Sequence, residues 1–147
     1  MLKVEVMSQH TQQRGFSLIE LLLVIGIIGI VAAVAVPSLL GARAAARQGA
    51  ALANLQTILK MEYGLKVSSG RFARMSEINQ QTGGTFGQLN VETLSRQGYA
   101  FTTIPASPTD AELRDNFRIA ATGPGPDGVT PYIFLLDESG VISQLSP

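Results

Sequence analysis

Few residues of this chain could carry out catalytic chemistry. The 147 residues include no cysteine, which excludes a disulfide, an iron–sulfur cluster and a thiol nucleophile. A Ser–His–Asp set would need the single histidine, His10, which lies in the polar first fifteen residues. Eleven basic residues balance eleven acidic ones, so there is no electrostatic footprint for nucleic acid. We therefore expect no enzyme, no catalytic residue, no cofactor, no bound metal and no specific nucleic-acid partner.

Glu20 has the most unusual sequence surroundings. It is followed by 22 uncharged residues, 21–42, of which 13 are Leu, Ile or Val. Roughly 20 such residues span a bilayer as a helix. Their apolar side chains supply roughly −4 to −8 kcal/mol on an insertion scale, and the segment lacks the polar face of a soluble helix. An ionised carboxylate at the start of this segment costs about 2–3 kcal/mol or more unless it finds a partner.

Two ordinary explanations of the apolar segment remain open at this point. The residues Ala33-Val34-Ala35 have the small-x-small pattern of a signal-peptidase site, which predicts cleavage after Ala35. An uncut single-span anchor is the other explanation. Basic residues lie on both sides of the segment, so they do not decide its orientation. Pro37 removes a backbone donor and predicts a kink or a loosened turn.

A short motif precedes the apolar segment. The residues Arg14-Gly15-Phe16-Ser17-Leu18-Ile19-Glu20, followed by that segment and Pro37, closely resemble the N-terminus of type IV pilins and of type II secretion pseudopilins. The resemblance implies that residues 1–15 form a leader, which a prepilin peptidase removes by cutting after Gly15. It further implies that Phe16 becomes the methylated N-terminus. Residues 16–40 would be the membrane and assembly helix, with Glu20 and Pro37 as its assembly residues.

The implied cleavage gives Glu20 a specific electrostatic role. A new α-amino group on Phe16 lies four residues from Glu20, which is about one helical turn. In a filament, the Glu20 carboxylate of an incoming subunit can pair with the terminal amine of its neighbour. Each charge is costly alone in an apolar setting, so the pair favours one register of packing. We interpret it as a register device rather than as a source of net stability.

Helix-forming residues continue beyond Pro37. Residues 38–67 are rich in Ala, Leu, Gln and Lys, which predicts one helix from residue 16 to about residue 67. Leu52, Leu55 and Leu59 form an apolar stripe that could face a sheet. Glu62 precedes Lys66 by four residues, which predicts an exposed ion pair. We expect residues 41–67 to form the amphipathic spine of a globular head.

Residues 68–147 have the pattern of a small mixed domain. Short helices are expected near residues 75–81 and 91–97. Four later segments have alternating apolar residues, which predicts that each forms a β-strand. Gly- and Pro-rich turns with short connections favour antiparallel pairing. The fold class is therefore α+β: a long N-terminal helix packed on an antiparallel sheet of about four strands, as in pilins. The expected strands are 99–104, 117–122, 131–136 and 141–145.

The C-terminal region departs from better-known members of the resembled families. Many pilins have a C-terminal disulfide loop, and this chain has no cysteine. Major pseudopilins usually carry a Trp-containing segment and a calcium site there, and this chain has no tryptophan. Asp127, Asp137 and Glu138 are too few for the six to eight oxygen ligands of calcium, so we expect ordinary turn chemistry. The run YIFLLDESGVISQ at residues 132–144 is similar to the end of short, cysteine-free pilins, and this similarity favours a pilus subunit.

Three functions remain in view. The resemblance implies a pilin that is stored in the bacterial inner membrane and then assembled into an extracellular helical homo-oligomer, with roles in adhesion or twitching motility. Its implied partners are the prepilin peptidase and methyltransferase, the inner-membrane assembly machinery, and membrane lipid before assembly. The second function is a pseudopilin in a periplasmic filament. The third is an anchored or secreted domain that does not assemble.

Overall fold

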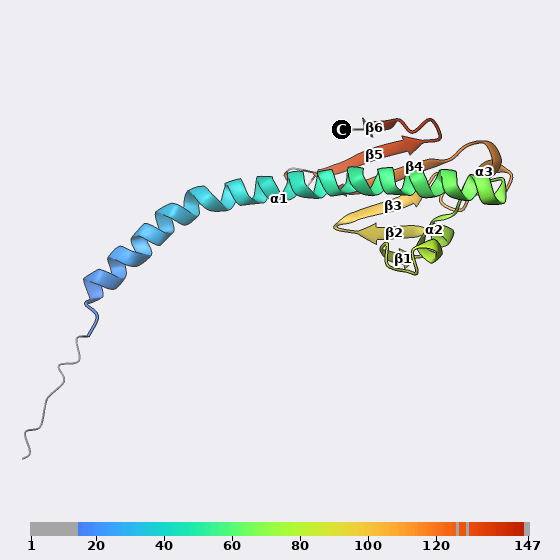
Figure 1. Ribbon diagram of the computed structural model, residues 1–147. Helices are drawn as coiled ribbons and strands as arrows, with labels where there is room; N and C mark the ends of the chain where they lie inside the picture. Colours follow the sequence, from blue (N-terminus) through green and yellow to red (C-terminus); the bar gives the residue numbers. More distant parts are fainter. Residues whose placement is uncertain (1–14, 126, 129, 146–147) are drawn as a thin grey trace, which may run out of the picture. The chain divides into compact units, whose positions relative to one another are not determined.

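The computed structural model describes residues 15–125, 127–128 and 130–145 (Figure 1). The chain divides into two compact units, residues 1–37 and residues 38–147. The predicted leader, including His10, lies outside the described residues except for Gly15. We describe each unit by itself.

The expected long helix is present as α1, Leu18–Ser69. It continues through Pro37. The helix ends where Gly70 adopts a φ of +76°, a left-handed conformation that glycine reaches without steric cost. The Gly70 N–H donates to the Lys66 carbonyl at 2.9 Å, which satisfies one of the carbonyls left free at the end of a helix.

The second unit contains a six-stranded antiparallel sheet in the order β1-β2-β3-β4-β5-β6 among the described residues. The α+β class is confirmed, and all four expected strands are present. The expected number of strands, about four, is too low because β1 and β2 were not predicted. The strands are β1 Gln88–Asn90, β2 Thr93–Arg96, β3 Tyr99–Thr103, β4 Arg118–Pro124, β5 Pro131–Asp137 and β6 Ile142–Leu145.

The helix expected at residues 91–97 is wrong, because this region forms two tight hairpins. Val91 and Gln97 have φ values of 56° and 54°, which are left-handed and incompatible with a helix. Between them, Leu94 of β2 is buried opposite Phe101 of β3. Cross-strand packing of this kind overrides the helix preference of the local sequence.

Two further short helices lie in the second unit. The expected helix at residues 75–81 is α2, Met75–Gln81, and its Met75 and Ile78 side chains are buried. A single-turn helix that was not predicted, α3, spans Glu112–Asp115 and buries Leu113. Both helices add apolar side chains to the core of the second unit.

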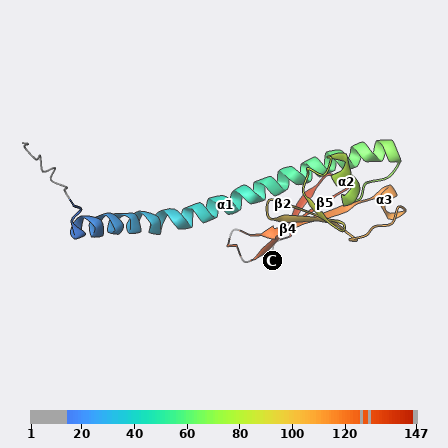
Figure 2. The ribbon, with the colours of Figure 1, turned by 90° about the horizontal axis from the view of Figure 1, so that it is seen from below.

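One face of the sheet packs against the second half of α1, and Figures 1 and 2 show these elements side by side. Of the expected stripe on α1, Leu55 is fully buried, while Leu52 and Leu59 are partly buried. The buried positions of α1 are spaced by three or four residues, as expected for one helical face. They are Ala51, Leu55, Ile58 and Glu62. The main sheet residues in this core are Leu94, Tyr99, Phe101, Ile119, Ala121, Phe134 and Leu136.

The acidic residues of the C-terminal turns are engaged in local hydrogen bonds. An Asp127 carboxylate oxygen accepts the Thr130 N–H at 2.9 Å, and an Asp137 oxygen accepts the Ser139 N–H at 3.0 Å. Hydrogen bonding, first of all from the Ser139 hydroxyl, lowers the pKa of Asp137. Over the described parts of the chain, no group of three or more His, Cys, Asp and Glu residues is arranged to hold a metal ion.

Candidate assembly segment

The predicted processing residues lie immediately before α1. Gly15, Phe16 and Ser17 are exposed and non-helical, and the first backbone bond that follows joins the Leu21 N–H to the Ser17 carbonyl at 3.2 Å. The Phe16 side chain is 83% exposed. A Cβ at Gly15 would meet nothing within 4 Å, so the fold of this chain itself does not require glycine there. Any requirement for a small residue at Gly15 must come from a partner.

Glu20 lies in the first turn of α1. An acidic side chain there interacts favourably with the positive end of the helix dipole. Within the residues that the structure describes, the Glu20 carboxylate makes no hydrogen bond and no ion pair, so its position leaves it free for a group from another chain.

The apolar side chains that surround Glu20 and follow it are uncovered. The large apolar residues from Phe16 to Leu40 range from 43% to 83% exposed. Soluble monomers rarely expose contiguous apolar patches above a few hundred Å². This segment therefore needs lipid or other protein chains around it. Pro37 is the last residue of the first unit, and it lies within the helix.

Among the described residues, α1 is the helix that is long and apolar enough to cross a membrane. Its most apolar 18-residue window has a mean hydropathy of 2.9, and none of that window is buried. A signal sequence near the N-terminus would pass the same test. Length and composition alone therefore do not separate a signal peptide from an assembly helix, and the residues before the helix must decide.

Comparison with known proteins bears on those residues. The prokaryotic N-terminal methylation motif matches residues 10–36. Over 138 residues the chain is 30% identical to the type IV major pilin protein PilA of Myxococcus xanthus (strain DK1622). The aligned region covers 94% of this chain and 58% of that protein. The chain thus has a prokaryotic N-terminal methylation motif and is similar in sequence to a type IV pilin. It spans 58% of the length of the pilin that it matches, and no solved structure matches it significantly.

The second unit, the head, contains a buried acidic residue that was expected at the surface. The expected exposed pair between Glu62 and Lys66 is wrong: Glu62 is fully buried, and one of its carboxylate oxygens accepts the Ala73 N–H at 2.6 Å. The Lys66 ammonium group instead lies 4.0 Å from the centre of the Phe72 ring. Glu62 is buried because it continues the apolar stripe formed by Ala51, Leu55 and Ile58. That spacing was the signal in the sequence that could have revealed it.

Burial also changes the acidity of Glu62. Removal from water raises the pKa of its carboxyl group to about 7, partly offset by the hydrogen bond from the Ala73 N–H. The nearby Glu77 carboxylate raises this pKa further, and the Arg71 guanidinium lowers it. Glu62 therefore carries a proton over much of the range below neutral pH.

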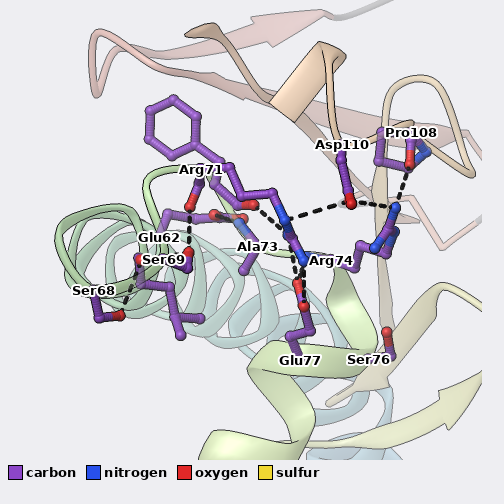
Figure 3. A network of polar contacts seen from close by, with 12 residues as sticks. Glu62, Ser68, Ser69, Arg71, Ala73, Arg74, Ser76, Glu77, Pro108 and Asp110 are labelled. Atoms are coloured by element: carbon purple, nitrogen blue, oxygen red, sulfur yellow. Dashed lines mark hydrogen bonds and ion pairs between the residues drawn. The ribbon is translucent and has the colours of Figure 1, made fainter. Parts of the chain in front are cut away.

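A network of charged side chains lies beside Glu62 (Figure 3). The Arg71 guanidinium pairs with Glu77 at 2.6 Å and with Asp110 at 3.3 Å, and Arg74 pairs with Asp110 at 2.7 Å. The hydrogen bond from Arg71 is the main cause that lowers the pKa of Glu77. The network ties the segment between α1 and α2 to the loop before α3. Ion pairs as well as apolar packing thus hold the head together beside Glu62.

Proposed function

We propose that this chain is a structural subunit of a type IV pilus. The observation that carries the proposal is the motif at residues 14–20 directly before an apolar helix that the rest of the described chain leaves uncovered. In this function the apolar part of α1 is held by lipid in the inner membrane before assembly and by the helices of other copies after it. Adhesion and twitching motility are the roles that this class of filament would serve.

Processing depends on Gly15 and Phe16 in this proposal. A prepilin peptidase cuts the peptide bond after Gly15, and the new amino group of Phe16 is methylated. The non-helical, exposed backbone of residues 15–17 supports access by such an enzyme, because a peptide bond must be extended and accessible to be cut.

Assembly depends on Glu20 and Pro37. The Glu20 carboxylate, which has no ion-pair partner among the described residues, pairs with the Phe16 amine of a neighbouring copy. This pair sets the register of one helix against the next. Pro37 lacks a backbone N–H, so the Ala33 carbonyl is left without its usual helical donor. This is the point at which the helix can adapt to close neighbours, and the inner-membrane assembly machinery would act on the chain through this unit.

The proposal is tested by the location and the N-terminus of the protein in cells that produce it. Surface material released by shearing and washed membranes are analysed separately by intact mass and N-terminal sequencing. A chain that begins at methylated Phe16 in the sheared material is the expected result. The same mature chain confined to the membranes would contradict a pilus and favour a pseudopilin. A chain that begins at Met1 or Val36 would contradict both.

A further inference from the structure

Glu62 is a fully buried acidic side chain of the head. The proposed assembly of the filament assigns it no role. One of its oxygens accepts the Ala73 N–H, and the other has no hydrogen-bond partner among the described residues. A buried carboxylate that is only half satisfied is costly when ionised, and much less so when it carries a proton.

Glu62 is bonded to the residues that join α1 to α2, residues 70–74, which we call the connecting segment. Its Phe72 N–H donates to the Leu113 carbonyl at 2.8 Å, and the next N–H, that of Ala73, donates to Glu62. Arg71 holds the segment to α2 through Glu77. Figure 3 shows this arrangement, in which the connecting segment lies between the Glu62 carboxyl and the charged network. Movement of the connecting segment away from α1 would break the bond from the Ala73 N–H and admit water to the Glu62 carboxyl.

We propose that Glu62 is a proton-operated latch of the head: the neutral carboxyl keeps the connecting segment closed, and loss of the proton favours a locally open state with a hydrated carboxylate. The closed state is the one that the structure describes. In the open state the Ala73 N–H exchanges its hydrogen bond to Glu62 for one to water. The latch lies entirely in the second unit, so it does not depend on the proposed role in a filament.

The charged groups around Glu62 set the pH at which the latch responds. Arg71 faces it from the connecting segment and Glu77 from α2, while Lys66, on the next turn of α1, is held over the Phe72 ring. Asp110 lies behind Arg71. Burial is the largest influence, and it raises the pKa of Glu62 from 4.5 to about 7.

The direction of the response follows from proton linkage. In the open state the hydrated carboxyl has its ordinary pKa of 4.5, and in the closed state its pKa is about 7. The closed state therefore binds the proton more tightly, and rising pH favours opening between these two values. The ratio of open to closed molecules rises about tenfold per pH unit in this window and about 300-fold in total. It is constant at lower and higher pH.

Amide hydrogen exchange measures this opening directly. We would record exchange at Ala73 in the full-length chain in detergent micelles from pH 5 to 8.5, with each rate corrected for intrinsic exchange. The expected result is a loss of protection that grows with pH up to about 7 and then levels off, shared by the Phe72 amide. An Ala121 amide in the centre of the sheet should not follow it. Protection of Ala73 that is independent of pH would overturn the proposal.

Two variants separate the latch from other effects of pH. Glu62→Gln keeps an acceptor for Ala73 without a titrating group, so the pH dependence should vanish whatever its overall stability. Glu138→Gln neutralises an exposed glutamate and should keep the full dependence. The same pH dependence in Glu62→Gln would contradict the latch. If that variant does not fold, the carbon-13 titration of the Glu62 carboxyl in the unaltered chain decides: a midpoint near 7 supports the proposal, and one near 4.5 overturns it.

Discussion

The two units of this chain use the same helix in opposite ways. In the first unit, the large apolar side chains of α1 are uncovered. In the second unit, α1 buries a narrow stripe against the sheet and leaves its other positions exposed or partly exposed. The first unit is thus incomplete without lipid or other chains, whereas the second has a core of its own. Packing within the chain therefore determines the structure of the head. Contacts with other molecules must determine the surroundings of the apolar segment.

The largest expected effect comes from the start of the first unit. Gly15→Leu should leave the full-length chain in the membrane, because the proposed peptidase needs a small residue before the cleaved bond. The fold should not change, since a side chain at Gly15 meets nothing within 4 Å. Intact mass of the membrane fraction measures the result. Normally processed chains from this variant would contradict the processing proposal.

A smaller but still large effect is expected at Glu20. Glu20→Ala should be processed normally and give severalfold fewer filaments, because the Phe16 amine loses its partner in the apolar interior. Sheared filaments are quantified against the processed chain that remains in the membrane. Glu112→Ala removes an exposed carboxylate from the other unit and serves as the control. Filaments from Glu20→Ala in normal amount and form would argue against the register role.

The contrast between the units can be tested with one pair of identical substitutions. Ile58→Ala removes a fully buried side chain and should lower the free energy of unfolding of the head by about 2–5 kcal/mol. Ile28→Ala removes a side chain that is 60% exposed, and it should change the same quantity by less than about 0.5 kcal/mol. Urea unfolding of both variants in micelles measures the difference. Equal effects would mean that the two parts of α1 unfold as one unit.

Stability should also depend on pH through the second unit alone. The pKa of Glu62 is raised to about 7 in the folded head and is ordinary in the unfolded chain. Its contribution is therefore fully present below pH 4.5 and is lost as the pH rises to 7, a loss of about 3 kcal/mol. Urea unfolding at pH 5 and pH 8 should show most of this loss in the unaltered chain and none of it in Glu62→Gln. Equal losses in the two proteins would assign the dependence to another group.

The smallest effects concern the end of α1. Gly70→Ala forces a side chain into a left-handed backbone and should destabilise the head by about 1 kcal/mol. Gly64→Ala, six residues earlier in an exposed helical turn, should instead stabilise it by about 0.5–1 kcal/mol. Thermal unfolding of the two variants gives the sign of each change. The same sign for both would contradict the left-handed end of the helix at Gly70.

Local pattern alone predicted much of this molecule. Uninterrupted apolarity marks the first half of α1, since a lipid-facing helix needs no polar face. Strict alternation identifies β3, β4 and β5, because each buries one face against the core. The motif at residues 14–20 is recognised from residue types and spacing alone, so its identification does not depend on the fold. Comparison with known proteins supports that motif, whereas the roles of Gly15, Phe16, Glu20 and Pro37 remain predictions.

Only the tertiary structure decided the rest. The strands β1 and β2 are short and largely polar. They exist because β3 offers β2 a hydrogen-bonded edge and a place to bury Leu94, and β2 in turn pairs with β1. Glu62 is a charged residue at the spacing of the buried stripe, and packing of the whole stripe against the sheet carries it into the core beside the connecting segment. Such outcomes depend on contacts between residues distant in sequence. A single sequence encodes the periodicity of each element, but not which element will lie against it.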